Sequence, residues 1–191
     1  MSEEPSSLQW AGWEEREIAT PGGRLRLEPV TREHAVEMVE VLKDPLLNEH
    51  IGERPPSLEY LTTRYEALSS RRSPAGDELW FNWIIRLNAE GLAVGYVQAT
   101  VREGSAALAW VVGVPWQGAG IATEAAAAMI GILQDRLTVT SFLASIAPSN
   151  RASQEVAARL GMRRSGVVDN REELWVVGVS PEVSADGGRA R

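Results

Sequence analysis

The spacing of apolar residues in the first third of the chain predicts one strand followed by two helices. Leu25 and Leu27 alternate with arginines, as in a short strand. Thr31 is a suitable N-cap for a first helix, whose apolar stripe is expected to hold Val36, Val39 and Leu42. Ser57 begins a second helix, with its apolar face formed by Leu58, Leu61, Tyr65 and Leu68.

The period then becomes two over three consecutive segments, "LWFNWIIR", "LAVGYVQATV" and "AALAWVVGV". In the first segment Leu79, Phe81, Trp83 and Ile85 fall on one side, and Trp80, Asn82 and Ile84 on the other. The connections are short, and "NAEG" is typical of a hairpin turn. The pattern predicts an antiparallel meander of three strands.

A helix over about 121–133, a strand "VTSFLASIA", another helix and a strand "EELWVVGV" complete the expected order. Gly161 stands where a left-handed C-cap belongs, followed by Met162. The fold class is therefore α/β mixed: a central, mostly antiparallel sheet with helices on both faces. Residues 1–20 are expected to form an arm whose Trp10 and Trp13 dock on the body, 21–180 the domain, and 181–191 a flexible tail.

Composition narrows the function. The 191 residues contain no cysteine, which excludes disulfides, thiolate metal sites and cysteine nucleophiles. The two histidines, His34 and His50, are too far apart in sequence to suggest a metal centre, and none is expected. A net charge of −7 argues against nucleic-acid binding. No apolar run approaches the roughly 20 residues of a membrane span. A cytoplasmic monomer or homodimer is expected.

The stretch "PWQGAGIATEAAAAM" places two glycines at the mouth of an alanine-rich helix. Helix N-termini have free N–H groups and a favourable dipole for anions, so a phosphate group is the expected ligand. The glycines could instead only relax the turn into the helix. A Rossmann site fits poorly, because Thr123 occupies the third glycine position and the preceding strands are hairpin-linked. A P-loop is excluded by the missing Gly-Lys-Ser/Thr.

Two motifs resemble those of the GCN5-related N-acetyltransferases, the GNAT superfamily. "QGAGIA" (117–122) is similar to the Q/R-x-x-G-x-G/A signature, and "NRASQEVAARLGM" (150–162) is similar to the second motif. The order of elements is also that of the family, so the resemblance covers about residues 24–178. "GIATEA", with Asn150 and Ser153, is most similar to the ribosomal-protein alanine acetyltransferase branch.

The resemblance implies acetyl-CoA as cosubstrate and a sheet that splays between its fourth and fifth strands. Backbone N–H groups at the helix mouth would wrap the pyrophosphate, at Gln117, Gly118, Ala119, Gly120, Ile121, Ala122 and Thr123. The pantetheine arm would pair with the strand edge at Val112 and Val114. Asn150 and Ser153 would line the other wall, although Asn150 could be only an N-cap and Ser153 only a first-turn residue.

The implied reaction is direct attack of an amine on the thioester, without a covalent enzyme intermediate. A backbone N–H near Val112 would stabilise the oxyanion. Many relatives have a tyrosine that protonates the thiolate where this chain has Ala157, which leaves Ser153 as the nearest hydroxyl. Glu172 is the expected general base. Glu172 could instead be a solvated residue at the strand start, and Glu78 is a weaker candidate for the base.

The acceptor stays open at this point: a protein N-terminus, an amino acid, a polyamine and an antibiotic amine all fit. At least half of the tryptophans at 80, 83, 110 and 116 are expected in the core, and any in the cleft would shape a pocket with Asn82 and Gln98. The acidic net charge weakly favours a cationic acceptor. Two other functions are possible: a non-catalytic acyl-CoA-binding regulatory module, because Ala157 replaces the tyrosine, and a nucleotide-dependent oxidoreductase.

Overall fold

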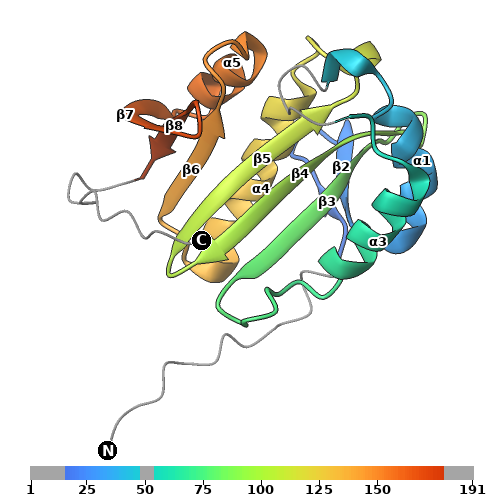
Figure 1. Cartoon of the computed structure of the whole chain (residues 1–191), viewed down its shortest axis with the longest axis horizontal. Helices are drawn as coiled ribbons and strands as arrows, with labels where there is room; N and C mark the ends of the chain where they lie inside the picture. The colour runs from blue at the N-terminus through green and yellow to red at the C-terminus, as the bar shows by residue number, and fades with distance from the viewer. Residues whose placement is uncertain (1–15, 48–53, 179–191) are drawn as a thin grey trace, which may run out of the picture.

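The computed structural model describes residues 16–47 and 54–178. They form one eight-stranded sheet with helices on both sides (Figure 1). The expectations for Trp10, Trp13, His50 and the tail at 181–191 concern positions outside the described residues. No helix in the described part of the chain is long and apolar enough to cross a membrane.

The strand order in the sheet is β1-β2-β3-β4-β5-β6-β8-β7. Every neighbouring pair is antiparallel except β5 and β6, which run parallel. The first four strands are β1 (Ile18–Ala19), β2 (Leu25–Pro29), β3 (Leu79–Leu87) and β4 (Ala93–Arg102). The other four are β5 (Ser105–Val112), β6 (Ser141–Ile146), β7 (Arg163–Asp169) and β8 (Glu172–Val177).

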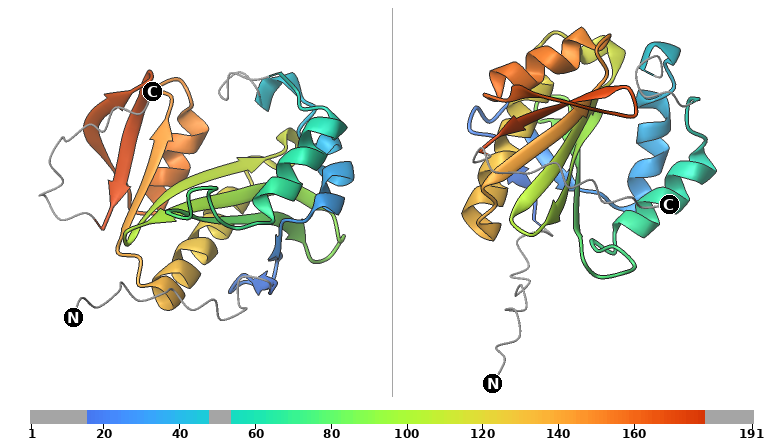
Figure 2. Two further views of the ribbon diagram at one scale, coloured as in Figure 1. Left: turned by 60° about the horizontal axis from the view of Figure 1, so that its bottom comes forward. Right: turned by 60° about the vertical axis from the view of Figure 1, so that its left-hand side comes forward.

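The meander of β3, β4 and β5 confirms the period-two prediction. The side of β3 that begins with Leu79 packs into the larger hydrophobic core, together with α4 (Ile121–Leu137). The opposite face of the sheet is covered by the 3₁₀ turn η1 (Arg32–His34), α1 (Ala35–Val41) and α3 (Leu58–Leu68), which enclose a second core. Figure 2 shows α4 on one face of the sheet and α1 and α3 on the other.

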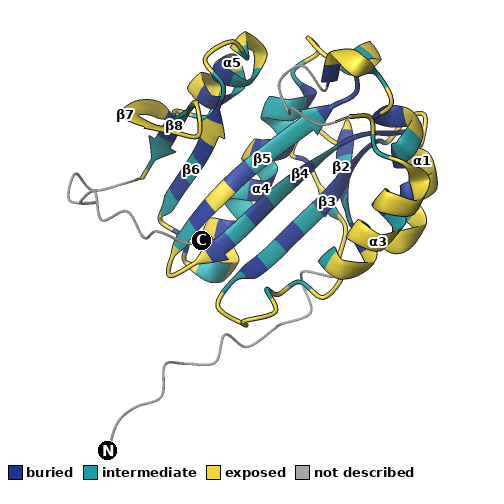
Figure 3. Ribbon diagram, viewed as in Figure 1, coloured by how far each residue is buried: buried dark blue, intermediate teal, exposed yellow. Residues whose placement is uncertain are grey.

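The predicted apolar stripe of the first helix was wrong in part. Val36 is 64% exposed, and the buried side of α1 holds Ala35, Met38 and Val41. Figure 3 shows buried and exposed positions alternating along α1. The predicted and the buried sets of residues both have helical spacing, so the apolar period alone does not decide which of them faces the sheet. In α3, Leu61 and Tyr65 are buried as expected, whereas Leu58 is 45% exposed.

Three further differences concern element limits. β7, which the sequence pattern did not reveal, has every residue exposed and therefore carries no apolar alternation. β1 pairs with β2, so the sheet begins before residue 21. The helix expected over 121–133 continues to Leu137 and ends at Thr138 in the left-handed conformation.

The sheet splays where the resemblance implied it. β5 and β6 pair only through Ser105–Ala107 and Ser141–Leu143, and beyond these residues the two strands separate. The gap opens toward the C-terminal ends of both strands, between β5 and α5 (Arg151–Arg159) (Figure 1). The 3₁₀ turn η2 (Val114–Trp116) and the N-terminus of α4 lie at the same end of the sheet.

Candidate active site

The glycine-rich segment between η2 and α4 is a loop whose backbone needs glycine. Gly118 and Gly120 both have a φ of +75°, a left-handed conformation that strains residues with a side chain. A Cβ at either position would meet nothing within 4 Å, so the two glycines also leave open space. The turn and the open approach are thus both present, and either reading of the glycines made from sequence accounts for part of the geometry.

The N-terminus of α4 presents unpaired donors to this loop. The first intrahelical bond runs from the Glu124 N–H to the Gly120 carbonyl at 3.0 Å. The N–H groups of Ile121, Ala122 and Thr123 precede that bond and have no intrahelical acceptor. Together with the positive end of the helix dipole, they suit a phosphate.

A glutamate in the first turn would oppose an anion, but Glu124 is neutralised locally. Arg24 on the β1–β2 turn donates to its Oε2 through Nε at 3.0 Å and Nη2 at 2.6 Å, and Thr20 donates to its Oε1 at 2.6 Å. Arg24 also donates to the Ala119 carbonyl at 3.0 Å, which fixes the loop. No local sequence pattern predicts this network, because its members are about 100 positions apart.

The edge of β5 beyond the splay has free backbone groups. The Gly113 N–H donates to the Val94 carbonyl at 2.8 Å, so residue 113 faces β4. Alternation along the strand then turns the N–H and C=O groups of Trp110 and Val112 toward the open edge. The Gln117 side chain donates to the Val112 carbonyl at 2.9 Å and leaves the Val112 N–H free for a ligand.

Val114 fits its predicted role less well. It begins η2, and its carbonyl already accepts the Gln117 N–H at 3.2 Å. The strand positions that a pantetheine arm could pair with are therefore Trp110 and Val112. Trp110 was not among the predicted cofactor residues, because a tryptophan on a central strand was expected mainly to fill the core.

The start of α5 forms the wall across the gap. Asn150 is the N-cap, and its Oδ1 accepts the Ser153 N–H at 3.0 Å. This confirms the N-cap reading of Asn150 and leaves its cofactor role a prediction. Ala157 is fully buried in α5, so no proton donor replaces the missing tyrosine at that position.

Two hollows open on either side of this gap. The first, here called the glycine-loop cleft, has a volume of about 400 Å³ and is bounded by the end of β5, η2, the glycine loop, the first turn of α4 and the exposed side of α5. Its lining includes all but one of the predicted cofactor residues, namely Val112, Val114, Gln117, Gly118, Gly120, Ile121, Ala122, Thr123, Asn150 and Ser153. Ala119 is not part of the lining, and its carbonyl points to Arg24.

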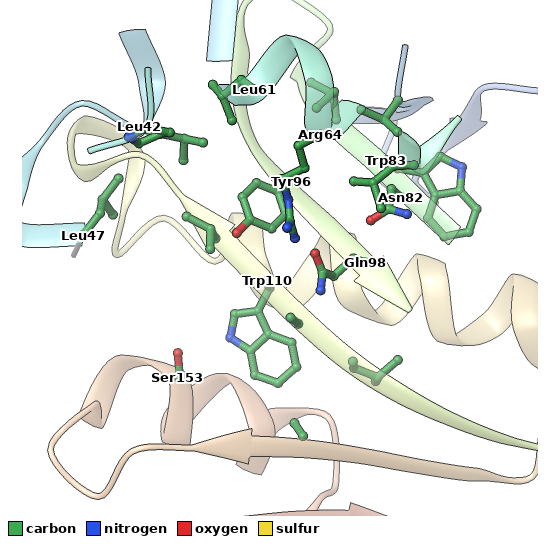
Figure 4. Close-up of a pocket in the computed structure, with 18 of the residues that line it drawn as sticks. Leu42, Leu47, Leu61, Arg64, Asn82, Trp83, Tyr96, Gln98, Trp110 and Ser153 are labelled. Atoms are coloured by element: carbon green, nitrogen blue, oxygen red, sulfur yellow. The ribbon is translucent and has the colours of Figure 1, made fainter. Parts of the chain in front are cut away.

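The second hollow, the α3 pocket, has a volume of about 340 Å³. Its walls come from α3, the segment after α1, the middle of β3, β4 and β5, the end of β6 and the start of α5. Asn82 and Gln98 are register partners across β3 and β4 and both line it. Figure 4 shows Arg64, Tyr96, Gln98 and Trp110 around the same space, with Ser153 on the facing wall.

The two hollows share part of their lining. Both contain Leu47, Trp110, Val111, Asn150 and Ser153. A ligand in the glycine-loop cleft and a ligand in the α3 pocket would therefore meet beside β5 and Ser153. This arrangement can bring two substrates together for a transfer reaction.

The structure places the two candidate bases differently. Glu172, the first residue of β8, lines the α3 pocket. Its neighbour Glu173 forms an ion pair with Arg164 at 3.3 Å and is not part of that lining. Glu78 also lies outside the lining, and its carboxylate accepts the Trp80 indole N–H at 3.0 Å.

The tryptophans divide as their exposure indicates. Trp83 is 1% exposed and stacks on Phe81 at 5.7 Å between ring centroids, and Trp116 packs against both cores. Trp110 is partly buried and lines both hollows. Within residues 16–47 and 54–178, no group of three or more histidine, aspartate or glutamate side chains could hold a metal ion.

A comparison with protein families matches residues 24–163 to the acetyltransferase (GNAT) domain. The chain belongs to the GNAT acetyltransferase family. It is therefore an acyltransferase. The glycine-loop cleft is lined by residues of "QGAGIA", the segment that resembles the first signature motif of the family. A comparison with curated protein sequences found no match.

Solved structures of GNAT proteins share the fold. A GNAT-family acetyltransferase from Bacillus anthracis is 19% identical, with a TM-score of 0.69 over 85% of this chain and 98% of that one. Mycobacterium smegmatis RimJ, solved in complex with CoA-disulfide, is 21% identical, with a TM-score of 0.71 over 87% and 88%. Aminoglycoside acetyltransferase AAC(6')-Ib, in complex with coenzyme A, is 20% identical, with a TM-score of 0.67 over 81% and 94%.

Proposed function

We propose that this GNAT protein transfers the acetyl group of acetyl-CoA to a primary amine of a small molecule or a protein N-terminus by direct attack. The observation that carries the proposal is the pair of hollows that meet beside Trp110 and Ser153. One has the features of a CoA site, and the other contains the candidate base. Two substrates can thus bind at once, which direct transfer requires.

The cofactor would bind in the glycine-loop cleft. Its pyrophosphate would accept hydrogen bonds from the loop and from the first turn of α4, where the charge of Glu124 is offset by Arg24. Its pantetheine amides would pair with the backbone of Trp110 and Val112. Arg159 also lines the cleft and would add a positive charge for a further phosphate group.

The reaction would take place at the junction of the two hollows. The free Val112 N–H lies on the open edge of β5 and would donate to the tetrahedral oxyanion. Glu172 would accept the proton of the amine, directly or through water. Ser153 would supply a proton to the departing CoA thiolate, which is itself a fair leaving group.

The resemblance to the ribosomal-protein alanine acetyltransferases belongs to this proposal. It rests on "GIATEA" with Asn150 and Ser153, and solved RimJ has the same fold. The same fold is found in RimL, a ribosomal L7/L12 alpha-N-protein acetyltransferase, and in an aminoglycoside acetyltransferase, so it is compatible with protein and small-molecule acceptors alike.

The first test is the thermal stability of the protein with CoA, acetyl-CoA and NADH. A ligand at 100 times its Kd that binds only the folded state stabilises by about 2.7 kcal/mol, which raises Tm by roughly 5 to 10 °C for a chain of this size. CoA and acetyl-CoA should give similar shifts, because the acetyl group adds few contacts. A shift with NADH and none with CoA would contradict the proposal and favour an oxidoreductase.

The second test is CoA release from acetyl-CoA over a panel of amines. Release that depends on the added amine, with the acetylated amine detected by mass spectrometry, would support catalysis. CoA binding without release for any amine would support the non-catalytic acyl-CoA-binding module instead.

A further inference from the structure

The charge of the α3 pocket differs from that of the whole chain. The chain carries a net charge of −7, yet two arginines, Arg54 and Arg64, line this pocket against one carboxylate, Glu172. Neither arginine forms an ion pair with any residue in the described part of the chain. The pocket therefore offers positive charge that no ion pair among residues 16–47 and 54–178 neutralises.

The two kinds of charge stand on opposite walls. Arg64 extends from α3 toward Tyr96 and Gln98, and Ser153 lies on the facing wall (Figure 4). Glu172 belongs to β8, which pairs with β6 on the far side of the splay. A ligand that spans the pocket would thus meet a guanidinium at one end, and a carboxylate beside the acetyl-transfer junction at the other.

Neutral donors surround the cationic end. Asn82, Gln98 and Tyr96 line the pocket floor, and Tyr65 lines the pocket from α3. The Tyr65 hydroxyl is buried and has no hydrogen-bond partner among the described residues. Burial raises the pKa of Tyr65, with a further contribution from Tyr96, so the hydroxyl keeps its proton and remains a donor. These groups suit an oxygen-bearing anion.

The remaining lining is apolar. Leu42, Leu47, Leu61 and Trp110 surround the same space (Figure 4). A volume of about 340 Å³ is at the small end of typical ligand pockets, which range from about 300 to 1,000 Å³. The pocket therefore fits a compact molecule with an apolar body.

We propose that the acceptor is a small amine that also carries a carboxylate, with an apolar body between or beside the two groups. The carboxylate pairs with Arg64, and the amine lies toward Glu172 and the junction with the glycine-loop cleft. This inference rests on the proposed acetyl transfer and specifies its substrate class. It also reverses the weak expectation of a cationic acceptor, because the arginines repel a polycation.

The arginine also favours the reactive form of the amine. A positive charge in the pocket disfavours the ammonium and favours the neutral amine that attacks the thioester. The acetyl carbon then forms a bond to the amine nitrogen, the thioester C–S bond breaks, and the sulfur leaves as a thiolate. The proton lost by nitrogen goes to Glu172 or to solvent.

Phenylalanine, phenylalaninamide and phenethylamine form a matched set to test this. They share an apolar body and an amine, and only phenylalanine has a carboxylate. The amide has the less basic amine, so a preference for the acid cannot result from a larger neutral fraction. We expect kcat/KM for phenylalanine to exceed both others by roughly ten- to a hundredfold, the range for a hydrogen-bonded charged pair. Spermidine should be a poor substrate.

Variants assign the preference to a residue. Arg64→Gln should remove this preference by raising KM for phenylalanine, and it should lower the rate with phenylalaninamide far less, because there only the effect of the charge on the neutral amine is lost. Arg64→Lys should restore only part of it, because lysine lacks the planar fork that binds a carboxylate in two places. Arg136→Gln, an equal loss of charge at an exposed position on α4, should change neither substrate.

Binding gives a second measurement that does not depend on turnover. With CoA saturating, calorimetry should show N-acetylphenylalanine binding more tightly than N-acetylphenylalaninamide, and Arg64→Gln should abolish the difference.

Equal use and equal binding of acids and amides would overturn the inference, as would an Arg64→Gln effect that is the same for all three amines. If the N-terminal amine of a peptide whose first side chain is uncharged is acetylated faster than phenylalanine, the acceptor is a protein. That result would also overturn the inference. Failure of the proposed function itself has a separate signature: no stabilisation by CoA and no release with any amine.

Discussion

At the scale of single residues, the proposed site would combine groups that bind substrates, groups that move protons and groups that hold other side chains in place. Glu172 and Glu173 are neighbours with different surroundings: the first lines the α3 pocket, and the second pairs with Arg164. Arg164 in turn lies over the Trp175 ring at 5.2 Å. Two adjacent glutamates thus have separate surroundings, because successive side chains of a strand point to opposite faces.

Glu172→Gln tests the proposed base. The amide keeps the shape of the side chain and removes its basicity, so kcat should fall about a hundredfold to ten-thousandfold at neutral pH. Raising the pH should restore part of the rate, because more of the amine is then already neutral. The measurement is a pH–rate profile with a good amine substrate, together with the Kd for CoA, which should stay almost unchanged.

Glu173→Gln is the matched control on the same strand. It loses the same charge but only weakens the pair with Arg164, whose guanidinium side chain is 53% exposed. We expect a near-wild-type rate and at most a small loss of stability. If Glu172→Gln behaves like the control at every pH, Glu172 is a solvated strand residue and the proton leaves through water.

The residue scale is also where sequence reasoning reached its limit. Gln117 to Ala122 could be placed because the motif is continuous in sequence. Arg24 and Arg64 could not, because their roles depend on partners or surfaces that only the folded sheet brings near them. From sequence alone, an arginine on the polar face of a helix is interpreted as a solvent-exposed charge. Only the folded structure shows that Arg64 lines a pocket.

At the scale of elements, patterns with a strong apolar period were predictable. β3, β4 and β5 alternate clearly because each has a buried face, and α4 is marked by its alanines. β7 was not predictable, since none of its residues is buried and its pairing with β8 carries no apolar signal. The buried side of α1 was misjudged because two apolar sets with the same spacing, one position apart, fit the helical period equally well.

The glycine loop gives a prediction at this scale, in which strain and charge must be separated. Gly120 has a φ of +75°, so Gly120→Ala should cost about 1 to 2 kcal/mol of stability through backbone strain alone. Gly120→Glu should cost a similar amount, but its carboxylate would repel the pyrophosphate at the helix mouth. We therefore expect CoA affinity to fall much further in Gly120→Glu than in Gly120→Ala.

The two variants are compared by urea unfolding and by CoA titration. Equal CoA affinities in Gly120→Ala and Gly120→Glu would mean that the glycine serves the turn only. In that case the phosphate site would lie elsewhere in the cleft, with Arg159 the next residue to test.

At the scale of the whole molecule, two features position the site: the splay between β5 and β6, and the ion pairs that hold α1 on the sheet. Both hollows open at the splay. It begins after only three residues on each strand have paired, and beyond them the strands diverge. The sheet and α1 are joined by a partly buried ionic network: Arg86 on β3 binds Glu28 on β2 at 2.7 Å and Glu37 on α1 at 2.8 Å, and the Glu37 side chain is 46% exposed. The network fixes α1 on the sheet face that carries the α3 pocket.

This network should make stability depend on pH. Burial would raise the pKa of Glu28, but hydrogen bonds from Arg86, His34 and Arg26 outweigh it and leave the pKa lowered. The hydrogen bond from Arg86 lowers the pKa of Glu37. Groups with a lowered folded-state pKa contribute stability above the ordinary glutamate value of 4.5, and that contribution is lost as the pH falls through the folded-state pKa.

Arg86→Met tests the contribution of this ionic network to stability. At pH 7 the variant leaves Glu28 and Glu37 charged and without Arg86, so it should be destabilised by on the order of 2 kcal/mol, between the values for buried and for exposed pairs. Below pH 4.5 both carboxyls take up protons more readily in the variant, and the difference from wild type should narrow. The measurement is the free energy of unfolding in urea at pH 7 and at successively lower pH.

Arg102→Met, which breaks an exposed pair with Asp77 at 3.7 Å, is the control and should cost less than about 1 kcal/mol at any pH. A deficit of Arg86→Met that stays constant as the pH falls would mean that the arginine stabilises through packing of its side chain rather than through its charge.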